Sequence, residues 1–128
     1  GLSVISDVLK TKVYELCNYI NERDGGIVIP KEIITKEPSA ELKEDQKDSD
    51  SLPEYNVLDP ILIAYINDDE SKENIIKMGF DKKIVEKVTG MVDKTEYKRR
   101  QAAIGLRIPP RAFGVGRRMP ITNGWVED

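Results

Sequence analysis

Three groups of side chains in this sequence could contact a charged ligand. Lys10 lies near the predicted start of a helix, where its ammonium and the free backbone N–H groups would face the same anion. Ser39 offers a hydroxyl in an irregular loop, and Tyr97 with Lys98 begins a basic run that continues to Arg100. The chain contains no histidine, which removes Ser/His and Cys/His catalytic pairs and nearly all histidine metal sites. Any chemistry must therefore use carboxylates, lysines, arginines and hydroxyls.

Each of these groups also has a simpler interpretation. Lys10 could be a solvated surface lysine. The basic run that follows Tyr97 could be a positive helix end stabilised by the helix dipole. The loop around Ser39 could be a surface connection with no role. The choice among these interpretations depends on the elements that position each group.

The loop that contains Ser39 follows neither helical nor strand periodicity. Pro38 biases the residue before it away from the helical region, and several acids with Pro53 extend the irregular run. We expect the loop 38–55 to be mobile until a ligand arrives, because few apolar side chains anchor it. We do not expect an EF-hand at residues 45–50, since the required glycine and closing glutamate are missing from the sequence.

Length and composition predict one small domain or a piece of a larger one. The chain has 128 residues, of which 39% are hydrophobic and 34% charged, so its core should be thin. It has no apolar run near the roughly 20 residues that a membrane span needs, and no secretory signal, so we expect a soluble, cytoplasmic protein without a membrane partner.

Cys17 is the single cysteine, which excludes a disulfide framework. Its place in the apolar register of a helix predicts a buried structural thiol.

The charges are unevenly distributed, although the net charge is only −3. Residues 37–56 are rich in acids, whereas residues 97–126 contain basic residues and no acid. The two segments could attract each other, or the basic one could face an anionic ligand. A small anion- or nucleic-acid-binding module that uses residues 98–118 is therefore an alternative function, and a structural helical cap at a dimer contact is a third. Apolar residues interleave the arginines, so we do not expect nucleic acid as a partner.

Helices are the main predicted elements. The firmest one follows Ser6 as its N-cap and is stopped by residues 24–26, and its apolar residues recur at helical spacing. Pro30 precedes a short helical turn at 32–34. The next helix is predicted from 57 to 66, with an Asp-Pro pair in its first turn. Its apolar face consists of Leu58, Ile61, Leu62 and Tyr65.

Two more helices are predicted in the second half of the chain, and no strand. A short helix spans 71–78 and ends at Gly79, and Asp81 opens a longer one that runs on toward Arg100. The apolar face of the longer helix consists of Ile84, Val88, Met91 and Val92. Helices without strands and with long loops make an unlikely autonomous domain, so we expect a fragment whose helices cover a sheet encoded upstream. Their uncovered apolar faces should make the chain self-associate.

Four stretches resemble successive motifs of NAD synthetase, in the order and spacing of that family. They are Ser6–Leu16, Pro38–Leu42 with Asp45 and Gln46, Leu52–Asp59, and Glu96–Gln101. The ending Ala112–Thr122 further resembles the glutamine-dependent branch of the family, in which an amidohydrolase domain precedes the synthetase domain.

The resemblance implies an α/β parent with an adenine-nucleotide hydrolase-like fold, a doubly wound parallel sheet. Residues 1–128 would be the C-terminal portion of its synthetase domain, mainly α-helical with long loops. The implied reaction activates the nicotinate carboxylate of deamido-NAD with ATP and Mg²⁺, and ammonia, from glutamine in the parent, then displaces AMP to give NAD. The family's phosphate-binding Ser-Gly-Gly-x-Asp-Ser signature, its acidic magnesium-binding residue and a glutaminase domain are not found in these residues. We therefore expect the chain to be inactive alone.

The resemblance also implies a role for single residues. Lys10 and Ser39 would contact ATP, and Tyr97 with Lys98 would hold deamido-NAD. Position 97 is a histidine in the short ammonia-dependent enzymes, and tyrosine keeps a flat ring and a hydrogen-bonding tip but changes the contact. No catalytic residue and no metal ligand is expected within this chain. The expected partners are the rest of the synthetase chain and further copies in a homo-oligomer.

Overall fold

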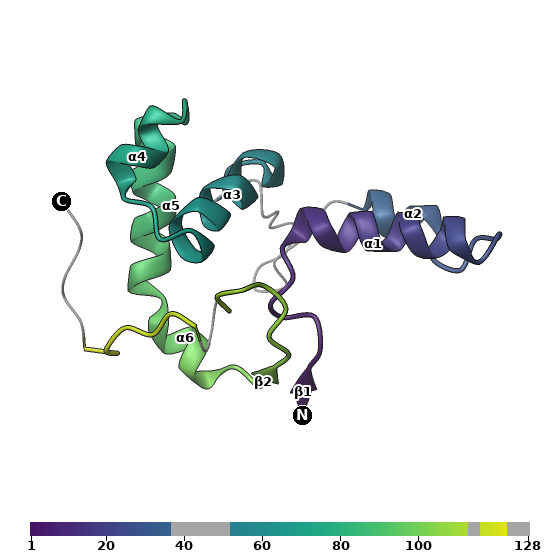
Figure 1. The fold of residues 1–128 in the computed structure, drawn as a ribbon. Helices are drawn as coiled ribbons and strands as arrows, with labels where there is room; N and C mark the ends of the chain where they lie inside the picture. Colours follow the sequence, from purple (N-terminus) through teal and green to yellow (C-terminus); the bar gives the residue numbers. More distant parts are fainter. Residues whose placement is uncertain (37–51, 113–115, 123–128) are drawn as a thin grey trace. The chain divides into compact units, whose positions relative to one another are not determined.

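The structure, a computed structural model, describes residues 1–36, 52–112 and 116–122 (Figure 1). The chain divides into two compact units. Unit 1 consists of Gly1–Val8 and Asp59–Asp128, and unit 2 consists of Leu9–Leu58. In the described part of the chain, no helix is long and apolar enough to cross a membrane. Ser39 and most of the loop 38–55 lie outside the described residues.

Unit 2 contains the first predicted helix, which is confirmed with one correction. Helix α1 spans Lys10–Arg23, and Gly25 follows its end with a positive φ of 63°. The predicted N-cap Ser6 is wrong, because Leu9 occupies the cap position and no side chain caps the helix. The Ser6 hydroxyl instead donates to the carbonyl oxygen of Ser3 at 3.0 Å, within a tight turn.

Asn21 of α1 forms hydrogen bonds with the chain that follows the helix. Its side-chain oxygen accepts from the backbone N–H groups of Val28 and Ile29 at 3.0 and 2.8 Å, and its amide donates to the Ile29 carbonyl at 2.9 Å. These bonds satisfy a stretch of backbone that belongs to neither helix nor strand. Helix α2, Lys31–Thr35, then follows Pro30, which confirms the predicted helical turn.

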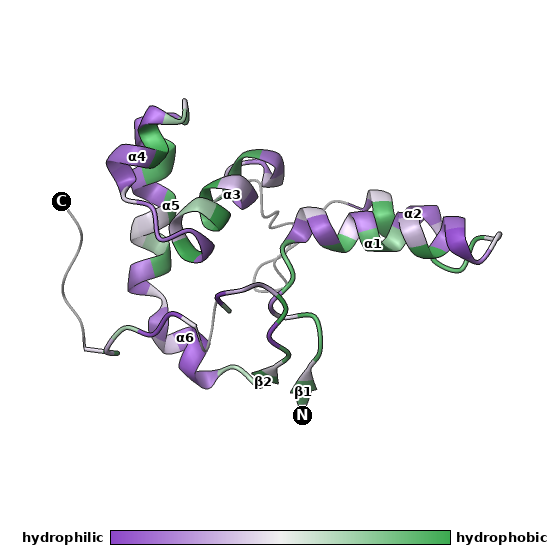
Figure 2. Cartoon of the chain, in the orientation of Figure 1, coloured by the Kyte–Doolittle hydropathy of each residue, from purple (hydrophilic) through white to green (hydrophobic). Residues whose placement is uncertain are grey.

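Neither α1 nor α2 contains a buried residue. Apolar residues nevertheless occur on both helices and between them, as the green positions in Figure 2 show. The large exposed ones are Leu16, Tyr19, Ile27, Val28 and Ile33. Cys17 is partly exposed, so the expectation of a buried thiol is not met in this chain. The apolar face of unit 2 lacks a cover within the described residues.

The second half of the chain is helical, as predicted, with different boundaries. Helix α3 spans Tyr55–Leu62 and continues as a π-helix, η2, over Ile63–Asn67. Pro60 therefore lies inside the helix rather than in its first turn, and its missing N–H leaves one carbonyl of the helix without its usual donor. Helix α4, Lys72–Lys77, is capped by the Ser71 hydroxyl and followed by Gly79 at a φ of 102°.

Helix α5 spans Lys82–Lys94 and packs against α4 in the core of unit 1 (Figure 1). The Asp81 side chain caps it, as predicted. The predicted apolar face is confirmed for Val88 and Val92 only. Met91 is exposed and Ile84 is partly exposed, whereas Val85 and Thr89 are fully buried. Thr89 tolerates burial since its hydroxyl donates to the Val85 carbonyl at 2.9 Å. The buried apolar residues of unit 1 are Ile61, Ala64, Tyr65, Ile66, Ile75, Val85, Val88, Val92 and Ala112.

The predicted continuation of this helix toward Arg100 is interrupted at Thr95. Helix α6 is a separate element over Glu96–Gln101. The Thr95 hydroxyl donates to the Met91 carbonyl at 2.7 Å, and the residue adopts a φ of −103° and a ψ of 17°. A threonine that bonds back to the preceding turn bends or ends a helix, which the apolar periodicity alone could not predict.

Two very short strands correct the expectation that the chain has none. Strand β1, Leu2–Ser3, pairs in parallel with β2, Ile104–Gly105. The pairing joins residues about a hundred positions apart, as parallel strands require a long crossover. A Cβ at Gly105 would collide with the Ser6 hydroxyl and lie 3.3 Å from the Ser3 carbonyl oxygen, so a side chain there would require Ser6 to turn away. The chain is thus mainly helical with a minimal parallel sheet.

The uncovered apolar face of unit 2 predicts the behaviour of the isolated 128-residue chain. We expect it to form dimers or larger species, because exposed apolar patches of this kind bind one another in water. Sedimentation equilibrium at several concentrations measures the mass directly. Replacing Leu16 and Ile33 by Lys in one variant should return the chain to a monomer. A wild-type chain that stays monomeric at high concentration would contradict this expectation.

Candidate functional site

The residues predicted to bind ligands lie in different units of the chain. Lys10 is the first residue of α1 in unit 2, and its side chain is exposed. Tyr97 and Lys98 are neighbours on α6 in unit 1, and Tyr97 is 46% exposed. Ser39 lies outside the described residues. The structure therefore places the two groups on accessible surfaces, each within its own unit.

Helix α6 has two chemically different faces. Tyr97 and Lys98 form the exposed face. On the other face Glu96 is buried, and it accepts from Arg99 Nη2 at 2.8 Å and from Arg100 Nε at 2.9 Å. The sequence alone treats residues 97–100 as one basic run. In the structure Tyr97 and Lys98 are exposed, whereas Arg99 and Arg100 form ion pairs with Glu96.

Burial would raise the pKa of Glu96, yet the hydrogen bonds from Arg100 and Arg99 and from the Met119 backbone hold it below the ordinary value of 4.5. The same cluster contacts residues 116–122, the C-terminal segment, because Arg100 Nη2 donates to the Met119 carbonyl at 3.2 Å. Glu96 therefore stays ionised at neutral pH and links α6 to residues near 119.

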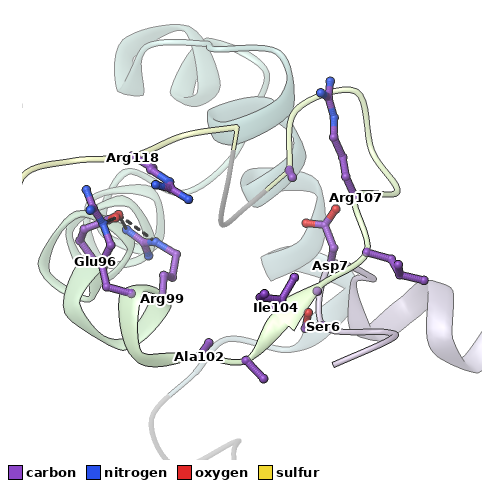
Figure 3. Close-up of a pocket in the computed structure, with 13 residues that line it drawn as sticks. Ser6, Asp7, Glu96, Arg99, Ala102, Ile104, Arg107 and Arg118 are labelled. Atoms are coloured by element: carbon purple, nitrogen blue, oxygen red, sulfur yellow. Dashed lines mark hydrogen bonds and ion pairs between the residues drawn. The ribbon is translucent and has the colours of Figure 1, made fainter. Parts of the chain in front are cut away.

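A cavity of about 370 Å³ opens between residues 6–7, strand β2, this buried face of α6 and the C-terminal segment (Figure 3). Asp7 lines it and accepts from the backbone N–H of Ile108 at 2.9 Å. Figure 3 shows Arg118 extending from the C-terminal segment toward the cavity. Arg107 also lines the cavity, and its guanidinium donates to the carbonyls of Pro109 and Pro110. Guanidinium groups outnumber the carboxylates around this space, so it favours an anionic group.

A third polar cluster anchors the C-terminal segment to the helical core. Arg117 lies over the ring of Tyr65, with its guanidinium carbon 3.9 Å from the ring centre. The same side chain donates to the Tyr65 carbonyl at 3.2 Å and forms an ion pair with Asp93 at 3.6 Å. The Tyr65 hydroxyl donates to both Asp93 oxygens at 3.1 and 3.0 Å. Burial raises the pKa of Tyr65 to about 12, so its hydroxyl keeps its proton at neutral pH.

Most arginines of the segment 98–118 are engaged in such pairs. Besides those already described, Arg111 forms an ion pair with Asp69 at 2.9 Å on the surface. These pairs use charges that a nucleic-acid-binding face would leave available for phosphates. Among the described residues, no cluster of three or more histidine, cysteine, aspartate or glutamate side chains could hold a metal ion.

Sequence reasoning missed Glu96 and Asp93 as organising residues. A signal existed for Glu96, because Arg99 and Arg100 follow it at the i+3 and i+4 spacings of helical ion pairs. No local signal existed for Asp93, whose partners Tyr65 and Arg117 are distant in the sequence.

The lowered pKa of Glu96 predicts an acid-sensitive stability. A carboxyl group with a depressed folded pKa contributes stability above its unfolded pKa, near 4.5, and loses it as the pH falls through the folded value. We expect Glu96→Gln to lower the free energy of unfolding at pH 7 by about 1.5–3 kcal/mol, because it removes charged hydrogen bonds. The difference between variant and wild type should shrink below pH 4.

Chemical denaturation between pH 3 and 7 measures this effect. Glu86→Gln is the matched control, because Glu86 pairs with Lys82 at 3.7 Å on an exposed surface of α5. It should change the free energy of unfolding by less than about 0.5 kcal/mol at every pH. A constant offset between wild type and Glu96→Gln across this range would show that the ion pairs of Glu96 contribute nothing.

Comparison with known proteins identifies what the chain is similar to. The family model of NAD synthase matches residues 1–102. A glutamine-dependent NAD(+) synthetase of Acinetobacter baylyi is 57% identical over 128 residues, which are 100% of this chain and 24% of that protein. One from a Synechocystis strain is 49% identical over 98% of this chain and 22% of its own length.

A solved structure is also similar over nearly the whole chain. It is glutamine-dependent NAD+ synthetase from Acinetobacter baumannii in complex with ADP, with 49% identity and a TM-score of 0.58. The match covers 95% of this chain and 20% of that one. The chain thus spans less than a quarter of the length of the relatives described here.

Proposed function

The chain belongs to the NAD synthase family, and we propose that it forms the C-terminal portion of the synthetase domain of a glutamine-dependent NAD synthetase. The observation that carries the proposal is the 57% identity to such an enzyme over all 128 residues. This identity includes residues 103–128, which the family model does not match. The family implies an adenine-nucleotide hydrolase-like parent. The short parallel pair β1–β2 supports a place beside a parallel, doubly wound sheet.

The proposed parent is an ATP-dependent carbon–nitrogen ligase. A carboxylate oxygen of deamido-NAD attacks the α-phosphorus of ATP, and pyrophosphate leaves. The nitrogen of ammonia, released from glutamine, then attacks the activated carbonyl carbon, and AMP leaves to give NAD. Each step moves negative charge onto phosphate oxygens, so the protein contributes mainly positioning and neutralisation.

Lys10 and Ser39 are proposed to contact ATP. Lys10 is exposed at the first position of a helix, where the positive end of the helix dipole also favours an anion. The relative from Acinetobacter baumannii binds ADP, which supports the use of an adenine nucleotide in this family. For Ser39 the support is the family motif around it.

Tyr97 and Lys98 are proposed to hold deamido-NAD. Both are exposed on α6, and among the described residues neither side chain has a hydrogen bond or ion pair. Lys98 can therefore meet a diphosphate or carboxylate group, and Tyr97 offers a ring and a hydroxyl. Such a pair suits a ligand that carries an aromatic ring beside negative charge.

Magnesium is proposed as the ion that accompanies ATP, where it would neutralise phosphate charge. The described residues do not offer a ligand cluster for it. The proposed partners are the remaining part of the synthetase chain and further copies of it, in the cytoplasm.

The proposal is tested by NAD formation in the full-length protein that carries this chain. With deamido-NAD, ATP, magnesium and either ammonia or glutamine, we expect NAD together with one AMP for each NAD formed. The isolated 128-residue chain should form none, because it lacks the family's phosphate-binding signature. An inactive full-length protein, or an active isolated chain, would contradict the proposal.

Lys10→Ala in the full-length protein should lower kcat/KM for ATP by about a hundredfold, because one preorganised charged donor to phosphate is lost. Steady-state kinetics with varied ATP measures the change. Lys12→Ala is the control in the same helix, since Lys12 forms an exposed ion pair with Glu15 at 2.6 Å. Equal kinetics for the two variants would exclude a contact between Lys10 and ATP.

A further inference from the structure

The junction between α5 and α6 decides where Tyr97 and Lys98 point. Thr95 is the only residue between the two helices, and α6 itself is six residues long. A helix this short has little stability of its own, so its direction depends on contacts with the rest of unit 1, among them those that bridge the junction. The exposed side chains of Tyr97 and Lys98 supply no such contact within the described residues.

Arg99 bridges the junction from the buried face of α6. Its Nη2 donates to the Val92 carbonyl in the last turn of α5 at 2.8 Å and to Glu96 Oε2 at 2.8 Å. Its Nε donates to the same carboxylate oxygen at 3.1 Å, and its Nη1 donates to the Thr95 hydroxyl at 3.3 Å. The Arg99 side chain is only 11% exposed, so these contacts are largely shielded from water.

One planar guanidinium thereby holds three groups on both sides of the junction. The Val92 carbonyl lies in the last turn of α5, where carbonyls lose their helical donors. The Glu96 carboxylate belongs to α6, and the Thr95 hydroxyl belongs to the linking residue. A lysine carries a compact ammonium and cannot span this set in the same fixed geometry.

We propose that Arg99 is a positioning residue, which fixes the direction of α6 against α5 and so presents Tyr97 and Lys98 to the anionic dinucleotide substrate. The inference rests on the proposed function for the identity of that substrate. It assigns Arg99 no contact with the substrate itself. Arg99 acts indirectly, because it sets the orientation of Tyr97 and Lys98.

Kinetics of the full-length protein test this indirect effect of Arg99 on substrate binding. We expect Arg99→Met to raise KM for deamido-NAD by about tenfold, with kcat and KM for ATP changed by less than about threefold. Arg99→Lys should recover only part of the loss. Adding Arg99→Met to a Tyr97→Ala/Lys98→Ala double variant should not weaken deamido-NAD binding further, because Arg99 acts through these two residues.

Arg111→Ala is the matched control. It removes another arginine of unit 1, whose ion pair with Asp69 is exposed on the surface, and it should leave KM for deamido-NAD unchanged. An unchanged KM in Arg99→Met, or a further loss of binding when Arg99→Met is added to the Tyr97→Ala/Lys98→Ala variant, would overturn the inference while the wild-type activity left the proposed function intact.

Amide hydrogen exchange gives a readout that does not depend on activity. Arg99→Met should speed exchange in residues 96–101, with exchange in α4 and in the first turns of α5 unchanged. If exchange rose equally throughout unit 1, Arg99 would be a general stabilising residue and the inference would fail. If the wild type formed no NAD, the proposed function would fail, and the local exchange result would still decide whether Arg99 positions α6.

Discussion

The buried carboxylate of Asp93 is the constraint on which the arrangement of unit 1 depends. Its side chain is only 2% exposed, and an ionised carboxylate removed from water is costly unless it is paired. The Tyr65 hydroxyl and the Arg117 guanidinium supply the pairing. Because Arg117 comes from the C-terminal segment, that segment cannot leave the helical core without stranding a buried charge.

The same constraint extends toward the proposed substrate-binding residues. Asp93 lies at the end of α5, directly after the carbonyl that Arg99 holds and shortly before the buried Glu96. Arg100 joins this cluster to the Met119 carbonyl, so the C-terminal segment is held at two points. The side chains of α6 therefore lie on two faces, one bound to the rest of the protein and the other exposed.

Local patterns in the sequence were sufficient to predict most helices. Gly25 and Gly79 mark helix ends with the positive φ that glycine adopts readily, and the Ser71 and Asp81 caps follow known helix-start chemistry. The break at Thr95 was not predictable from periodicity, since it depends on one hydroxyl competing for a backbone carbonyl. The family resemblance predicted Tyr97 and Lys98 as site residues. The long-range contact of their helix, from Arg100 to the Met119 carbonyl, has no local signal in the sequence.

The two strands and the buried Asp93 cluster escaped prediction for the same reason. Leu2 pairs with Ile104, and Tyr65 meets Arg117, only after the chain has folded back on itself. Two-residue strands carry no alternation of apolar and polar residues that could identify them. Contacts of this kind are set by tertiary packing, so the sequence alone predicts the elements better than their junctions.

The most direct test of this account is a crystal structure of the full-length protein with deamido-NAD bound. The account predicts that the Lys98 ammonium and the Tyr97 side chain contact the dinucleotide, while Arg99 still joins the Val92 carbonyl to Glu96. A dinucleotide bound away from α6, or an Arg99 side chain released from both groups in the complex, would contradict it.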